Sequence, residues 1–308
     1  MKLDYKLFYR LTLALGVLTP LSFILRIYTY WKELDVTSGF FSGKSAGCFV
    51  FNVIAFAVFF LCLLLTYRKK GVTIGSAAVS APAGTDPEDD SLVVQDSDLD
   101  DEVAEEFPQY FLHGFAKRCS VWQGTFSAFA AFLLAFGFIS HGISFLLDKE
   151  SLSDPYVTVY LALSLISGAF YLFYAFRNSA ERSRFLAVLS LAPAFWCTLR
   201  MIIEYRDLTR FLNKGLYVGQ FLFVIAALVF FLYQAQILLG EDVLARPNAY
   251  VFSGAAVAFL GLTARLPQLF AVMGNRIQID LFASTSLLAD LAITLFVISK
   301  LLATTKRP

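Results

Sequence analysis

Eight apolar runs, each long enough to cross a bilayer, dominate this chain of 308 residues. A run of about 20 apolar residues spans the ~30 Å hydrocarbon layer as a helix. Because lipid offers the backbone no hydrogen-bond partners, each run must be helical, and the alternating pattern of a membrane barrel is absent from the sequence. The sequence predicts an all-α polytopic membrane helix bundle with about eight transmembrane helices. The predicted spans are 7–25, 47–66, 119–147, 156–176, 185–203, 216–239, 249–273 and 277–303.

The composition supports this class and excludes several others. Hydrophobic residues make up 58% of the chain and charged residues 16%, against about 45–50% and about 25% in soluble domains. These values exclude an ordinary soluble enzyme, a disordered protein and a nucleic-acid-binding domain. We therefore expect the lipid bilayer as the main partner and no nucleic acid.

The distribution of Lys and Arg predicts the orientation. If the N-terminus is cytoplasmic, 15 of the 25 basic residues lie on the cytoplasmic side and eight on the other. Cytoplasmic loops carry an excess of basic residues, so both termini are predicted to be cytoplasmic. The first apolar run follows basic residues, as in a signal peptide. It continues through Leu25 without a small-residue cleavage site, however, so we interpret it as a retained span.

One connection is much longer than the others and divides the chain. It covers residues 67–117, and its stretch 86–106 holds 11 of the 24 acidic residues. Removing these eleven charges from the net +1 leaves +12 for the rest of the chain. We expect a disordered acidic cytoplasmic linker between a two-helix N-terminal membrane hairpin, 1–66, and a six-helix membrane bundle, 118–308. The acidic stretch is either a docking site for a basic protein partner or a solubilising linker.

The sequence contains no recognisable catalytic or metal-binding motif. None of the four cysteines forms a CxxC pair and there are only two histidines, so a zinc or iron–sulfur site is not expected. A Gly-rich phosphate loop and a nucleophile with a neighbouring base are also absent from the sequence. We predict no cofactor, no metal and no catalytic residue, and an enzyme has no motif in its favour.

Ionisable residues within the spans require an explanation, because each costs about 2.5–3.5 kcal/mol at a helix centre. Arg200 and Glu204 lie four residues apart on one face of the fifth span, where a self-contained salt bridge is the simplest interpretation. Arg265 lies in the seventh span, just before Pro267. The sequence predicts that prolines bend three spans. These prolines are Pro20, Pro193 and Pro267.

Asp290 lies near the middle of the eighth span. Ser286 and Thr294 lie four residues to either side, so the three form a polar stripe on one helix face. An aspartate at this depth needs a partner from another helix, and we expect either Arg265 or Arg200 to provide it. Asp290 is then either part of a proton, cation or cavity site, or half of an interhelical pair that fixes packing.

Six charged or titratable residues are predicted to lie in the outer half of the bilayer. If their faces converge, they form a polar, mostly basic cavity open to the outside, which suits a small anionic or zwitterionic solute. His141 alone is more typical of a hydrogen-bonded packing group. The six residues are Arg26, His141, Arg200, Glu204, Arg265 and Asp280.

Three stretches carry a resemblance. They are LDVTSGFF at 34–41, APAFWCTLRMIIEYRD at 192–207, and the span 220–240. Together they resemble a group of uncharacterised multi-span bacterial membrane proteins of unknown function with a variable linker after the second span. The resemblance implies a bacterial cytoplasmic membrane and the eight-span layout, and it implies no activity.

Two function hypotheses follow. The first is small-solute transport or permeation through a polar cavity involving Arg200, Arg265 and Asp290, which predicts that these side chains converge and have a route to water. The alternative is a non-catalytic membrane scaffold or sensor that binds a partner through its acidic cytoplasmic linker. It predicts closed packing of the spans and pull-down of partners by residues 71–116.

Overall fold

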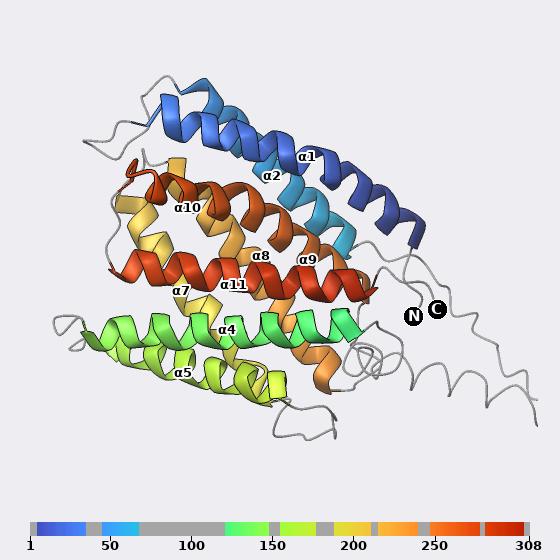
Figure 1. The fold of residues 1–308 in the computed structure, drawn as a ribbon, viewed down its shortest axis with the longest axis vertical. Helices are drawn as coiled ribbons and strands as arrows, with labels where there is room; N and C mark the ends of the chain where they lie inside the picture. Colours follow the sequence, from blue (N-terminus) through green and yellow to red (C-terminus); the bar gives the residue numbers. More distant parts are fainter. Residues whose placement is uncertain are drawn as a thin grey trace, which may run out of the picture.

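The fold is taken from a computed structural model of the chain (Figure 1). The structure describes residues 5–34, 45–67, 121–147, 155–176, 188–210, 215–239, 247–277 and 281–304. The predicted linker 67–117 lies outside the described residues except for Tyr67, and so do its acidic stretch 86–106 and Asp280.

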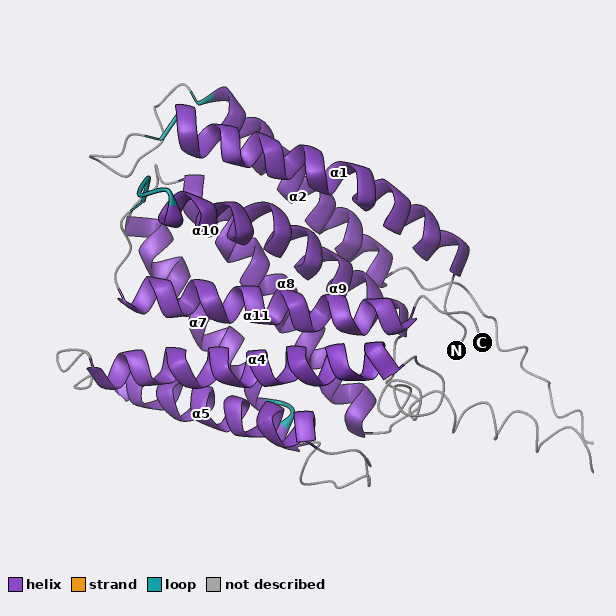
Figure 2. Cartoon of the chain, in the orientation of Figure 1, coloured by secondary structure: helices purple, strands orange, loops and turns teal. Residues whose placement is uncertain are grey.

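Helices account for nearly all of the described residues, which contain no β-strand (Figure 2). Because α9, η2 and α10 follow one another without a break, the described elements pass along the bundle eight times. The all-α fold with about eight long helices is therefore confirmed. The elements are α1 (Tyr5–Lys32), α2 (Ala46–Tyr67), α4 (Val121–Leu147), α5 (Pro155–Phe176), α7 (Ala192–Arg210), α8 (Gly215–Leu239), α9 (Pro247–Leu260), η2 (Gly261–Arg265), α10 (Leu266–Met273) and α11 (Leu281–Thr304).

Seven of the eight passes are long and apolar enough to cross a membrane. The eighth, α7, carries five charged residues in 19 positions, which lowers its hydropathy. It nevertheless packs between α5 and α8 as part of the same bundle. The predicted bounds of this span, 185–203, are wrong, because the helix starts at Ala192 and continues to Arg210.

The late start of α7 also corrects one expectation about proline. Pro193 was expected to bend the fifth span, but it lies in the first turn of α7. The backbone N–H groups of a first turn have no partner within the helix, so a proline there removes no bond and favours helix initiation. Pro20, in contrast, lies inside α1, and Pro267 lies in the first turn of α10.

The helices pack as a bundle with two pairs at opposite edges. In Figure 1, α4 and α5 run side by side at one edge and α1 and α2 at the other. Between the pairs, α11 packs on α4, and α9 packs on α11 and on α8. The start of α1 and the end of α11 point to the same end of the bundle (Figure 1), as an even number of passes requires.

The outer surface of α1 has the character expected for contact with lipid. Leu13, Val17, Leu21 and Ile24 recur every three or four residues and are between 58% and 63% exposed. A soluble protein rarely leaves so continuous an apolar stripe in water, whereas lipid covers it at no cost. The described helices are therefore those of a multi-pass membrane protein.

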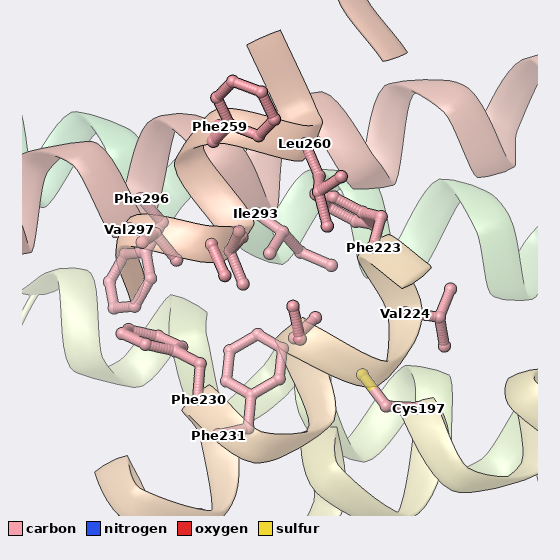
Figure 3. Packing of buried hydrophobic residues seen from close by; sticks show 14 of the residues in the cluster. Cys197, Phe223, Val224, Phe230, Phe231, Phe259, Leu260, Ile293, Phe296 and Val297 are labelled. Atoms are coloured by element: carbon pink, nitrogen blue, oxygen red, sulfur yellow. The ribbon is translucent and has the colours of Figure 1, made fainter. Parts of the chain in front are cut away.

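Aromatic side chains fill the interior of the bundle (Figure 3). Phe223, Phe230, Phe231 and Phe296 are almost completely buried, together with Val297. Phe230 and Phe231 lie edge-to-face, with their ring centroids 5.6 Å apart. Edge-to-face contacts of this kind are typical of closely packed aromatic side chains in protein interiors.

Candidate functional site

Asp290 is completely buried on α11 and binds two arginines from two other helices. Arg200 on α7 forms an ion pair with Oδ1 through Nη1 and donates a 2.8 Å hydrogen bond to Oδ2 through Nη2. Arg265 at the end of η2 forms an ion pair with Oδ2 through its own Nη2. The sequence predicted one of these partners, and the structure brings both. We refer to Arg200, Asp290 and Arg265 as the Arg–Asp–Arg bridge.

Glu204 and Gln220 close this bridge into a ring. Oε1 of Glu204 accepts hydrogen bonds from Nε of Arg200 and Nε2 of Gln220, each at 2.7 Å. Oε1 of Gln220 then accepts from Nη1 of Arg265 at 2.8 Å. The Arg200–Glu204 pair is confirmed at its predicted spacing, but it is one side of a larger ring rather than a self-contained salt bridge.

Two further side chains accept hydrogen bonds from the arginines. Ser286 accepts a 2.9 Å hydrogen bond from Nη2 of Arg200, and Gln268 accepts a 2.7 Å hydrogen bond from Nη1 of Arg265. Sequence reasoning included Ser286 in the polar stripe but missed Gln268. Gln268 could have been predicted as a partner of Arg265 from its position three residues later, because this spacing places both side chains on the same helix face.

The ring is buried and its charges balance. Arg200 is 3% exposed, Arg265 2% and Glu204 9%. Two arginines oppose Asp290 and Glu204, so the four formal charges sum to zero. Buried ion pairs are expensive to desolvate, and apolar residues of similar volume often stabilise a protein equally well. Stability alone therefore does not explain why this site is charged.

Three buried polar atoms near the bridge have no hydrogen-bond partner among the described residues. They are Oε2 of Glu204, Nε of Arg265 and Nε1 of Trp196. The first two belong to the ring itself, and Trp196 lies one turn before Arg200, whose guanidinium carbon is 5.1 Å from the indole centroid. Unsatisfied polar atoms in a buried site have unused capacity to bind a small polar molecule.

A π-helical turn positions Arg265. In η2 the N–H of Leu266 donates to the carbonyl of Gly261, five residues back instead of the usual four. Pro267 follows directly and has no N–H to continue an α-helical register. The change of register occurs where Arg265 reaches α11. Such π-turns are often found at functional sites.

Small residues let the neighbouring helices approach the bridge. Gly261 lies against Thr294 of α11, where an added Cβ would come within 2.6 Å of the Thr294 Cγ2. On the other side of α11, a Cβ at Gly137 of α4 would lie 3.0 Å from the Cα of Ala289. Both contacts lie within about one turn of Asp290, so α11 is held closely between α4 and η2 at this level.

His141 lies beside the bridge in a polar and aromatic cluster. Its Nδ1 is 3.0 Å from Oγ1 of Thr285, and its Nε2 is 2.9 Å from the hydroxyl of Tyr160. The ring of Trp196 stacks on Tyr160, with centroids 5.5 Å apart. His141 is thus a buried, hydrogen-bonded group, connected to the bridge through α11 and through Trp196.

Arg26 lies between α1 and α2 and is not part of the Arg–Asp–Arg bridge. It is completely buried, donates a 3.5 Å hydrogen bond to the Cys48 sulfur, and lies 4.5 Å from the centroid of the Phe51 ring. The structure therefore brings Arg200, Glu204, Arg265 and Asp290 together and leaves His141 and Arg26 at the flanks.

The chemistry of the bridge is that of oxyanion recognition. Guanidinium groups bind two coplanar oxygens through parallel hydrogen bonds, and here Asp290 supplies those oxygens. In the described part of the chain, no group of three or more His, Cys, Asp or Glu residues is placed to hold a metal ion.

No protein-family model, no curated protein and no solved structure matches the chain. The resemblance to multi-span bacterial membrane proteins therefore stays a prediction, and the site is interpreted from its own geometry.

Proposed function

We propose that this integral membrane protein binds a small anionic solute at the Arg–Asp–Arg bridge and transports it across the bilayer. One observation carries the proposal, namely a single buried carboxylate, Asp290, shared by two guanidinium groups from two other spans. An intramembrane charge is costly, and charged groups kept at such depth commonly mark a substrate or ion pathway.

In this proposal the side chain of Asp290 occupies the position that the solute takes. Arg200 and Arg265 together direct three N–H groups at the two carboxylate oxygens. A solute carboxylate or similar oxyanion reproduces that arrangement once Asp290 is displaced. The two arginines are therefore already arranged to bind an oxyanion, and the solute replaces the carboxylate of Asp290.

Replacing Asp290 by the solute also explains how the helices could move relative to one another. Asp290 ties α11 to α7 and to η2, so displacing it removes the ion pairs between these three elements. Interfaces with two discrete arrangements turn such local changes into larger shifts. The π-turn beside Arg265 is an element that can change register when its ion pair is released.

The scaffold or sensor hypothesis predicts closed packing of the spans, which the burial of the bridge fits. It stays a prediction, because the acidic stretch 86–106 lies outside the described residues. The assignments to a bacterial cytoplasmic membrane and to cytoplasmic termini likewise stay predictions.

Solute uptake into proteoliposomes tests the proposed function. The probes are radiolabelled lactate and radiolabelled phosphate, and the variant is Arg265→Gln, which removes one guanidinium from the bridge. The matched control is Arg276→Gln, the same substitution 11 residues further along and outside α10 and α11. We expect wild type and Arg276→Gln to take up at least one probe and Arg265→Gln to lose that uptake.

Circular dichroism and gel filtration establish that each variant is folded before uptake is measured. If Arg265→Gln does not fold, Arg265→Lys takes its place, because it keeps the charge but lacks the planar fork. Equal uptake by wild type and the bridge variant, or uptake of neither probe by wild type, contradicts the proposal.

A further inference from the structure

We infer that the solute is a small monoanion bound together with one proton, and that Asp290 carries the proton. This inference rests on the proposed function and adds its substrate class and its coupling ion. It follows from the charge balance of the ring, from the partners of Asp290, and from the groups that face it.

The charge balance of the ring sets how many protons bind with each solute anion. Arg200 and Arg265 are balanced by Asp290 and Glu204, so the ring without solute is neutral. Adding an anion to a neutral buried site leaves one negative charge without compensation, which is costly at low dielectric. One proton taken up from solution restores neutrality. A dianion requires two protons, so the neutral ring favours a monoanion.

Asp290 is the group that must accept this proton. Among the described residues, Asp290 forms its ion pairs with the two arginines, and the solute takes these same arginines. The displaced carboxylate then lies beside a second anion in a dry site, and two like charges so close cannot both stay ionised. The proton binds to a carboxylate oxygen of Asp290, and no covalent bond breaks.

The other titratable groups around Asp290 are less able to accept this proton. Oε2 of Glu204 on α7 has no hydrogen-bond partner in the described part of the chain, but Oε1 keeps the bonds from Nε of Arg200 and from Gln220 of α8. The solute needs neither of these donors, so the charge of Glu204 stays compensated. His141 of α4 has both ring nitrogens within hydrogen-bond distance of hydroxyl groups, those of Thr285 and of Tyr160 from α5. A proton on His141 therefore requires one of these contacts to be rearranged.

The protonated side chain also has a partner close by. Ser286 lies one turn before Asp290 on the same face of α11 and now accepts a hydrogen bond from Arg200. A hydroxyl oxygen has two lone pairs, so Ser286 can keep this bond and also accept the new O–H of Asp290. The neutral carboxyl group thus remains satisfied inside the bundle.

The first test measures lactate binding to the purified wild-type protein by calorimetry. Lactate stays ionised at neutral and mildly acidic pH, since free carboxylic acids titrate near pH 4. If binding takes up one proton, the dissociation constant rises about tenfold for each unit of pH. Buffers of different ionisation enthalpy report the proton uptake directly, and we expect about one proton for each lactate bound.

The second test uses Asp290→Asn, which keeps the shape of the side chain and leaves the ring at +1. This variant should bind lactate with an affinity that does not change with pH. Lactate should also raise its melting temperature more than that of wild type, because the anion replaces the missing carboxylate. The double variant Asp290→Asn/Arg265→Gln, whose ring is neutral again, should lose this extra stabilisation.

The possible outcomes separate the two proposals. Lactate binding by wild type with no proton uptake overturns the inference and leaves the proposed function intact. Absence of lactate binding in both wild type and Asp290→Asn overturns the monocarboxylate site, whereas phosphate uptake in the proteoliposome assay would still support transport. If Asp290→Asn does not fold, the wild-type pH dependence and proton uptake decide the question alone.

Discussion

Arg200 and Asp290 are 90 residues apart in the sequence, yet they form a two-point pair inside the bundle. The same arginine holds Glu204 through Nε and Ser286 through Nη2. A planar guanidinium group has five N–H donors at fixed angles and reaches all three partners at once. Arg200 is therefore the residue through which α7 and α11 are joined.

Replacing Arg200 by lysine should destabilise the protein although the charge is kept. A lysine has a single ammonium group and cannot hold Glu204, Ser286 and Asp290 together. We expect a loss of about 1.5–3 kcal/mol, the range for hydrogen bonds to charged groups. Thermal unfolding in detergent measures it, with Arg10→Lys at an exposed position of α1 as the control. Equal melting temperatures for the two variants would show that the fork of Arg200 is not needed.

Arg265 and Asp290 should behave as a coupled pair. Asp290→Asn leaves two buried arginines without their shared carboxylate, and Arg265→Gln leaves an excess negative charge in the ring. Each single change should cost about 3–5 kcal/mol when no anion is present. The double variant should cost less than the sum, because it keeps the ring neutral. Additive losses in this double-mutant cycle would argue against direct coupling.

Gly261 is expected to tolerate no side chain. A Cβ there would lie 2.6 Å from Cγ2 and 2.8 Å from Cβ of Thr294, so α11 and η2 would have to separate. Gly261→Ala should destabilise the protein by about 1–3 kcal/mol, as overpacking does. Gly16→Ala is the matched control, since nothing lies within 4 Å of a Cβ at that position. Thr294→Ala in the same chain should restore part of the loss. Failure of the second substitution to help would mean that the hydroxyl and Cγ2 of Thr294 are not the obstacle.

His141 should contribute to stability through its two hydrogen-bond partners. Replacing it with phenylalanine keeps an aromatic ring but removes one hydrogen bond of the Tyr160 hydroxyl and one of the Thr285 hydroxyl, which keeps its contacts with Ser144 and with the Leu281 carbonyl. We expect a loss of about 1–3 kcal/mol, because two buried hydrogen bonds are removed and each contributes about 0.5–1.5 kcal/mol. Tyr160→Phe removes only the hydrogen bond to Nε2 of His141 and leaves the contact between Nδ1 and Thr285 in place, so it should cost less. The comparison uses melting temperatures of the two variants, and the reverse order would contradict this role.

The local sequence contained enough to predict the helices and one side of the ring. The eight apolar runs become helices because lipid leaves the backbone no other partners. The pair between Arg200 and Glu204 follows from a spacing of four residues within one helix. The start of α7 was harder to predict, because an apolar stretch before Pro193 looks the same whether it continues the helix or forms the turn at 190–191.

The partners of Asp290 were only partly predictable. Its depth in the eighth span showed that it needs a cation from another helix, and Arg200 and Arg265 were the candidates. That both bind it depends on how the spans rotate and how closely they approach. Those details are set by packing between α11, α7 and η2, which a single sequence does not encode in any local pattern.

The apolar runs and the ionisable residues within them already predict a bundle of membrane helices with charges inside it. Which of these charges meet depends on how the helices pack. A side chain reaches only as far as its helix allows, and the close contact of Gly261 with Thr294 and the π-turn before Pro267 place Arg265 within reach of Asp290. Arg26, equally charged and equally buried, lies between α1 and α2, because the bundle turns that face toward Cys48 and Phe51.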